Sequence, residues 1–291
     1  MKDLKLHASL LEQVSRLRTR GLIIDNETFA ETLLSNANYY RLTGYLHNFK
    51  DSESDKYCDG ITIERLKRIY EFDRKLTRIL MYALEDVEET FKTRLSYTIT
   101  QQYPNDPLIY LKPNIYRDYA QYISFLAHFY ETVDKNKDIP FVKHHKDNYG
   151  GNFPMWVAVE LFTMGNLCAV YENLQANHQK KIAKTYNTGS QQMKSWIENL
   201  KDTRNHLAHY MRIYNFNLGK SPAKCKNHPK FQTATNMIFD QVCVMADMFS
   251  DAAEWNEYVI PEIARIIEAY SNDIELRSIG FPDNGKEVLS L

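Results

Sequence analysis

The sequence predicts an all-α protein, and three observations support that prediction. Glycine and proline are scarce, at 10 and 9 of 291 residues, so few points break the chain into short segments. Apolar residues between positions 62 and 103, such as Leu66, Ile69 and Phe72, recur at steps of three and four residues without an intervening glycine or proline. No pair of short alternating segments predicts a β-hairpin. The expected architecture is therefore a helical bundle.

Residues 1–58 are expected to form a small N-terminal helical lobe. The spacing of apolar residues predicts a helix over 3–20 that ends near Gly21. Asp25 or Asn26 can cap a second helix that runs to about residue 34. An aromatic-rich turn or helix is expected over 38–49, and the polar segment 50–60 is the best candidate for a linker.

Residues 59–291 are expected to form the larger helical domain. Its first helix, over 62–103, is predicted either as one rod of roughly 60 Å or as two nearly collinear pieces, and prolines at 104 and 107 end it. A loop is expected over 147–154, and a polar, basic loop over 217–229. Further helices are expected over 116–134, from Pro154 onward, over 178–186 and 190–210, and over 231–250 and 255–277.

The composition is typical of a cytoplasmic globular protein. No segment approaches 18 consecutive apolar residues, and the first residues lack the apolar stretch of a signal peptide. The four cysteines are far apart and form no C-x-x-C pair, so we expect reduced thiols. We therefore expect no contact with a membrane.

Charge is distributed unevenly along a nearly neutral chain. The formal net charge is -1, but residues 199–231 carry a net +6 and residues 251–291 a net -6. Such asymmetry indicates a local site for a polyanion. The alternative is that the acidic C-terminal stretch folds against the basic stretch and neutralises it.

The residues with the greatest chemical capacity lie between Arg204 and His209. Cleavage of RNA by its own 2′-hydroxyl requires a base, an acid and a fixed cation near the phosphorus. Histidine titrates near neutrality and can be either the base or the acid, while arginine keeps its charge and matches phosphate oxygens. Asn205 can orient the substrate or the imidazole. The second histidine would be His206 or the His209 of a second subunit in a symmetric dimer.

Other roles for these residues remain open on spacing alone. Arg204 can instead form a salt bridge, with both histidines packed at a helix edge, because the Arg-x4-His pattern is short and degenerate. His206 and His209 can supply two metal ligands, but no carboxylate or cysteine at a recognisable spacing completes a site. We therefore expect no metal and no cofactor.

Residues 204–215, RNHLAHYMRIYN, resemble the signature of bacterial abortive-infection proteins of the AbiD/AbiF type, which belong to the HEPN ribonuclease superfamily. That signature is an arginine, a polar residue, three or more others and a histidine. Toxins of this class that a nucleotidyltransferase silences carry a tyrosine two positions after the histidine, where this chain has Met211. Similar segments follow in the same order along nearly the whole chain, at residues 16–26, 38–45, 69–97, 153–174, 195–209 and 280–284.

The resemblance implies a HEPN-type helical bundle that dimerises to form a composite ribonuclease site. Carried over by position, the catalytic residues are Arg204, Asn205 and His209, and Arg212 and Asn215 match further family positions. It also implies a role in phage defence, in which RNA cleavage halts the infected cell. Some relatives are associated with a small structured non-coding RNA, so such a partner is expected beside the RNA substrate.

Two further functions remain as alternatives. The chain can hold a structured RNA without cutting it, or it can be a partner-binding helical protein whose motif histidines are merely packed. RNA contacts would come from the basic stretch and from the aromatic N-terminal region, through Arg212, Lys220, Lys224, Lys226, Arg41, Tyr39 and Tyr40.

Overall fold

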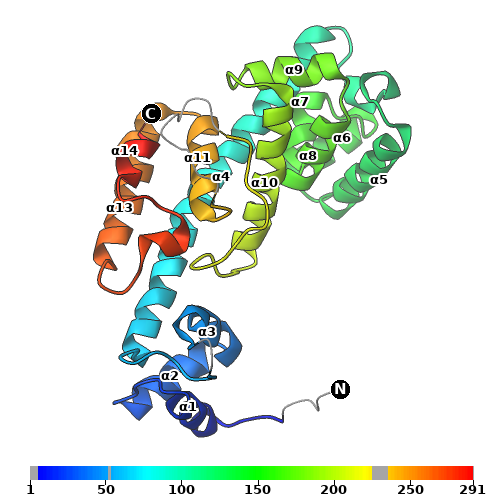
Figure 1. The fold of residues 1–291 in the computed structure, drawn as a ribbon. Helices are drawn as coiled ribbons and strands as arrows, with labels where there is room; N and C mark the ends of the chain where they lie inside the picture. The colour runs from blue at the N-terminus through cyan, green and yellow to red at the C-terminus, as the bar shows by residue number, and fades with distance from the viewer. Residues whose placement is uncertain (1–5, 52–53, 225–234, 291) are drawn as a thin grey trace.

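The structure is a computed structural model that describes residues 6–51, 54–224 and 235–290. Within these ranges the regular structure is helical, with isolated β-bridges but no β-strand, and the prediction of an all-α protein is confirmed. Figure 1 shows the arrangement.

The α-helices are α1 (Leu10–Thr19), α2 (Glu27–Asn36), α3 (Tyr39–Tyr45), α4 (Ile63–Gln102), α5 (Tyr119–Lys135), α6 (Pro140–Tyr149), α7 (Met155–Ala158), α8 (Met164–Asn173), α9 (Ala176–Lys184), α10 (Ser190–Ala208), α11 (Ile238–Met248), α12 (Ala252–Glu254), α13 (Ile260–Ala269) and α14 (Gly285–Leu289). Short 3-10 turns are η1 (His47–Phe49), η2 (Ile109–Leu111), η3 (Pro113–Ile115), η4 (Val159–Leu161) and η6 (Leu276–Ile279), and η5 (Trp255–Val259) is a π-turn.

Helix α4 is one continuous helix of 40 residues, so the single-rod form of the prediction is confirmed. The hydroxyl oxygen of Thr62 caps its start by accepting from the amide of Arg65 at 3.1 Å. It ends at Gln102, because Pro104 disfavours helical geometry at Tyr103. One face, which includes Leu76 and the other apolar residues of the predicted stripe, is fully buried.

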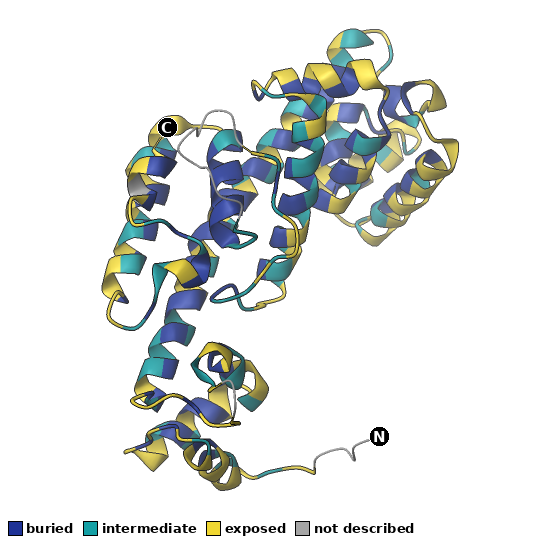
Figure 2. Cartoon of the chain, in the orientation of Figure 1, coloured by how far each residue is buried: buried dark blue, intermediate teal, exposed yellow. Residues whose placement is uncertain are grey.

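Helices from both the N-terminal and the C-terminal parts of the chain pack against α4 along its length. Helix α3 lies against its first turns, α10, α11 and α13 flank it further on, and α7 and α9 cover its C-terminal part. In Figure 2, the residues coloured as buried gather on the helix faces that are turned toward α4. Leu42 and Leu46 of the N-terminal lobe belong to the same apolar cluster as Leu66 and Phe91. The boundary near residue 58 stays a prediction.

The described residues of segment 50–60 do not form a free linker. The amide of Asp51 bonds the carbonyl of Lys56 at 2.9 Å, the amide of Tyr57 bonds the carbonyl of Arg20 at 2.6 Å, and Lys50 pairs with Asp55 at 2.7 Å. The segment therefore folds back onto the N-terminal lobe, because its backbone groups find partners there that its polar composition did not reveal.

Two predicted helices are divided in the structure. The helix expected from Pro154 onward is broken after η4, because Thr163 and Asn166 form a capping box that starts α8 afresh. The helix expected over 255–277 begins with the π-turn Trp255–Val259 and ends at Ala269. Pro261 follows that turn and lacks the amide that a regular α-helix would use.

Candidate functional site

The C-terminal turns of α10 carry the motif residues Arg204–His209. One side of this helix, which includes Leu200, is buried against the core. Arg204 is partly exposed and lies beside α4, against which α10 packs. Asn205 and His209 are both exposed, and they share one side of the helix because residues four apart lie one turn from each other.

Helix α10 ends in a Schellman motif at the motif histidine. The amide of Tyr210 bonds the carbonyl of Leu207 at 2.9 Å, and the amide of Met211 bonds the carbonyl of His206 at 3.0 Å. Tyr210 adopts a left-handed backbone with φ of 57°, which costs a non-glycine residue about 1 kcal/mol or more. Its side chain is 71% exposed, so ring burial does not compensate the strain. A strained, exposed residue next to His209 is typical of a functional site.

The motif residue Arg204 is held by an ion pair with a glutamate of α4. Its Nε lies 3.6 Å from Oε2 of Glu88 on α4, and the side chains are 42% and 16% exposed. Glu88 also lies 3.7 Å from Nζ of Lys92. The salt bridge considered for Arg204 is therefore present. Asn205 and His209 form no side-chain hydrogen bond or ion pair within the described part of the chain.

His206 turns toward the protein interior. Its Nε2 lies 2.7 Å from the carbonyl oxygen of Arg212, so this nitrogen carries the proton and donates. The ring also packs on Phe216, with 4.6 Å between ring centroids. Burial lowers the pKa of His206, and the bond to the carbonyl offsets only part of that effect. His206 is thus less available than His209 as an acid or base.

A buried carboxylate anchors the chain that follows the motif. Asp73 of α4 accepts hydrogen bonds from the amide of Tyr214 at 2.7 Å, the amide of Ile213 at 3.1 Å and the hydroxyl of Tyr45 at 2.6 Å. Burial raises the pKa of Asp73 to about 6, although these hydrogen bonds act to lower it. Asp73 therefore joins the N-terminal lobe, α4 and the motif segment at one point.

Our sequence reasoning missed Asp73, although a signal for it was present. Asp73 lies on the apolar face of the 62–103 helix, between Ile69 and Leu76 at helical steps. An acidic side chain inside such a face must find hydrogen-bond donors when the face is buried. Its partners could not be named from that pattern, because Tyr45 lies 28 residues before Asp73, and Ile213 and Tyr214 lie 140 and 141 residues after it.

Arg212 has a different environment from the one expected for an RNA contact. It is half-buried, its guanidinium carbon lies 5.8 Å from the ring centroid of Tyr45, and its Nη1 is buried with no hydrogen-bond partner among the described residues. Burial lowers the pKa of Arg212, against the influence of Tyr45 and Asp73. Lys220 and Lys224 are exposed. Lys226 lies outside the described residues.

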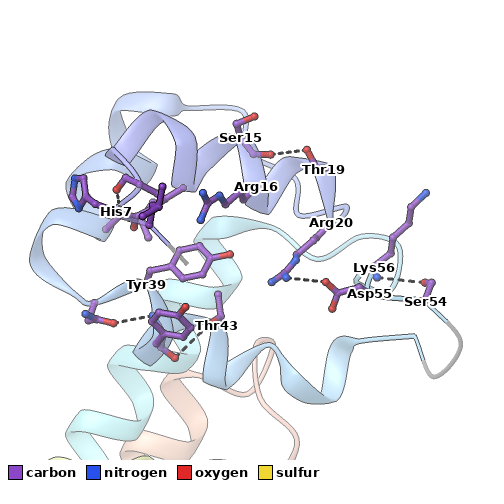
Figure 3. A pocket seen from close by; sticks show the side chains of 16 residues that line it. His7, Ser15, Arg16, Thr19, Arg20, Tyr39, Thr43, Ser54, Asp55 and Lys56 are labelled. Atoms are coloured by element: carbon purple, nitrogen blue, oxygen red, sulfur yellow. Dashed lines mark hydrogen bonds and ion pairs between the residues drawn. The ribbon is translucent and has the colours of Figure 1, made fainter. Parts of the chain in front are cut away.

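The aromatic residues Tyr39 and Tyr40 line a pocket of about 840 Å³ in the N-terminal lobe. Figure 3 shows Tyr39 within this pocket, near Arg16 and Arg20. Tyr40 is 70% exposed, and its ring meets that of Tyr39 edge to face at 5.7 Å. Arg41 points elsewhere, because its guanidinium donates to the carbonyl of Tyr210 at the end of the motif helix. The structure thus brings Arg41, but not the two tyrosines, to the motif.

Three acidic residues of 251–291 pair with arginines that lie outside the basic stretch 199–231. Asp273 pairs with Arg68 at 2.9 Å, and Glu262 and Glu275 pair with arginines within two or three residues of themselves. The described residues contain no group of three or more histidine, cysteine, aspartate or glutamate side chains that could hold a metal ion. Among the described helices, none has the length and apolarity needed to cross a membrane.

Comparison with known proteins identifies the family. The family model described as Abi-like protein matches residues 32–215, which is more than half of the chain. The match includes the whole of α4, the motif helix α10 and the anchored segment that follows it. No curated protein and no solved structure matches the chain. The chain therefore belongs to the Abi-like proteins, a bacterial abortive-infection family.

Proposed function

We propose that this Abi-like protein acts in abortive infection as a metal-independent endoribonuclease of the HEPN superfamily. The observation that carries the proposal is the state of the motif side chains. Asn205 and His209 are exposed and have no internal partner in the described part of the chain, beside an arginine at the same helix end. Asn205 and His209 are therefore free to contact a substrate, because they do not form hydrogen bonds or ion pairs within the described part of the chain. They also lie beside a strained backbone position, which favours a functional role.

The proposed reaction is an internal transesterification. A base removes the proton of the 2′-hydroxyl, whose oxygen attacks the phosphorus, and the bond from phosphorus to the 5′-oxygen breaks. An acid supplies a proton to that leaving oxygen, so the products carry a 2′,3′-cyclic phosphate and a 5′-hydroxyl. Arg204 stabilises the negative charge of the phosphorane, His209 transfers a proton, and Asn205 orients substrate or imidazole.

We propose that two copies of the chain form the active cleft. The reaction needs an acid and a base on opposite sides of the phosphorus, and His206 is already bonded to a backbone carbonyl. A two-fold axis beside the motif would supply the second His209. Tyr210 and Met211, which are 71% and 49% exposed, offer apolar surface for such a contact.

Arg204 must change partner before it can act on a phosphate. Its ion pair with Glu88 is long and partly exposed, so little free energy opposes its release. The phosphate of bound RNA offers a bidentate partner in place of the carboxylate. We therefore propose that Arg204 leaves Glu88 when RNA enters the cleft.

The direct test is cleavage of a fluorescent RNA in EDTA. The wild-type protein should produce 2′,3′-cyclic phosphate ends, and His209→Ala should abolish the cleavage. His128→Ala is the matched control, because His128 is an exposed histidine on α5, away from the motif. Cleavage of the RNA by His209→Ala at the wild-type rate would refute the proposed nuclease activity.

A mixing experiment tests the composite cleft. Wild-type protein mixed with an excess of His209→Ala protein should lose most of its activity, because a heterodimer contains only one of the two His209 side chains that the proposed reaction needs. Activity that stays proportional to the amount of wild-type protein, with subunit exchange confirmed by labelled protein, would contradict a shared site.

A second candidate function is the holding of a structured RNA without cleavage. The pocket lined by Tyr39, Tyr40, Arg16 and Arg20 favours it, since tyrosine faces stack bases and arginines bind phosphates. RNA should copurify with the protein, and its binding should weaken steeply with salt. Binding with no cleavage by the wild-type protein would favour this function over the nuclease.

A further inference from the structure

A second pocket lies directly against the motif. Its volume is about 410 Å³, and it is bounded by α3, α4 and the end of α10. Leu207, Ala208, Tyr210 and Met211 line it, so its wall includes residues on both sides of His209. A ligand in this pocket would therefore lie beside the proposed cleft.

Three arginines line this pocket without a carboxylate partner. Arg41 donates to the carbonyl of Tyr210, Arg74 donates to the hydroxyl of Tyr70 at 2.9 Å, and Arg78 forms no hydrogen bond or ion pair within the described residues. Arg74 and Arg78 are four residues apart on α4, so both guanidinium groups extend from one side of the helix.

Among the described residues that line this pocket, Asp73 is the only acidic one, and it does not neutralise the arginines. Its oxygens already accept from the hydroxyl of Tyr45 and from the amides of Ile213 and Tyr214. Three guanidinium groups that face one cavity repel one another until an anion enters it. The cavity thus has the charge and the donors of an anion site.

The neighbouring pocket carries charges of both signs. On the Arg204 side of the motif, Arg78, Lys92 and Arg204 line the wall together with Glu85, Glu88 and Glu89. Its positive and negative side chains balance, whereas the arginine pocket has an excess of positive charge. The charge difference therefore favours the arginine pocket over its neighbour as the place where a polyanion binds.

We propose that the pocket formed by Arg41, Arg74 and Arg78 binds a backbone phosphate of the RNA strand next to the cleavage point. This inference rests on the proposed function, because it places an RNA strand at the motif. Planar guanidinium groups match phosphate oxygens in pairs, and those of Arg74 and Arg78 extend from one side of α4. The ligand is a phosphate within a strand rather than a free nucleotide.

The test measures the binding of a single-stranded 2′-O-methyl RNA, which cannot be cleaved, by fluorescence anisotropy at several salt concentrations. Arg74→Gln/Arg78→Gln should weaken binding about tenfold at low salt. The slope of log Kd against log salt should decrease by about 0.7, which is the contribution of one phosphate contact on a single strand. Glutamine preserves the helix, and an unchanged circular dichroism spectrum and Tm verify the fold.

Two controls separate this site from a general effect of charge. Lys143→Gln/Lys146→Gln removes two exposed positive charges from α6 and should leave affinity within twofold of wild type. Arg74→Lys/Arg78→Lys keeps the charge but not the planar fork, and should recover only part of the affinity. Equal losses of RNA affinity in Arg74→Gln/Arg78→Gln and in Lys143→Gln/Lys146→Gln would overturn the proposal.

The remaining outcomes distinguish this inference from the proposed nuclease. If RNA is cleaved but Arg74→Gln/Arg78→Gln binds it as wild type does, the pocket proposal fails and the nuclease stands. If RNA is not cleaved but the double variant binds it weakly, the pocket proposal stands without the nuclease. Displacement of the RNA by millimolar AMP, lost in the double variant, would identify a free-nucleotide site and overturn the assignment to a strand.

Discussion

Removal of the Tyr45 hydroxyl tests how the motif segment is anchored to α4. In Tyr45→Phe, Asp73 loses the donor at 2.6 Å but keeps the amides of Ile213 and Tyr214. Tyr45 and Asp73 are 1% and 2% exposed, so water cannot easily replace the lost donor. A hydrogen bond to a charged group contributes about 1.5–3 kcal/mol, and one between neutral groups about 1 kcal/mol.

The cost of Tyr45→Phe should therefore depend on pH. Burial raises the pKa of Asp73 from 3.8 to about 6, so the folded chain holds this proton more tightly than the unfolded chain. The free energy of unfolding contributed by this group falls as the pH rises from about 4 to about 6 and is level above. The Tyr45 hydrogen bond lowers the pKa of Asp73, so its removal extends the fall to higher pH. We expect a cost of about 1 kcal/mol at pH 5 and of about 1.5–3 kcal/mol at pH 8.

Urea unfolding followed by circular dichroism at pH 5 and pH 8 measures this difference. Tyr122→Phe is the matched control, because the Tyr122 hydroxyl donates at 2.6 Å to a neutral acceptor, the carbonyl of Leu111. Its cost should be the same at both pH values. A cost of Tyr45→Phe that does not increase between pH 5 and pH 8 would refute the assignment of an ionised Asp73 as the anchor.

Three further predictions concern the motif itself. Glu88→Gln should change the free energy of unfolding by less than about 1 kcal/mol, because the ion pair with Arg204 is partly exposed. It should also lower the KM for RNA, because Arg204 no longer has to leave a carboxylate before it binds a phosphate. An unchanged or higher KM would contradict the proposed competition between Glu88 and RNA for Arg204. Tyr210→Gly should raise the free energy of unfolding by about 1 kcal/mol, because glycine adopts the left-handed backbone without strain. Tyr210→Ala, measured by the same urea unfolding, should show no comparable increase. Equal increases in the two variants would argue against backbone strain at residue 210. His206 should titrate below its ordinary pKa, because burial disfavours the charged ring; since its folded pKa is lowered, stability should be lost as pH falls below about 6.5. An NMR titration of the ring protons, assigned with His206→Asn, checks this, and a midpoint at or above the ordinary pKa would contradict the buried placement.

The sequence by itself determined the features that depend on neighbours along the chain. The three- and four-residue steps between 62 and 103 predicted helix over the whole of α4, as one rod or two nearly collinear pieces, because a stripe of apolar side chains at that spacing must face a core. Pro104 located its end, since a proline restricts the residue before it. The run from Arg204 to His209 identified the motif, and the same reasoning placed it at the end of a helix near residue 210.

Only the tertiary structure decided which partners those residues have. Asp73 contacts Ile213 across 140 residues, and Glu88 contacts Arg204 across a helix interface. No local pattern specifies such pairs, because they depend on how two helices pack and on which buried polar groups still lack a hydrogen bond. Arg212 illustrates the limit: its sequence position suggested an exposed cation, but packing against Tyr45 turned its guanidinium inward.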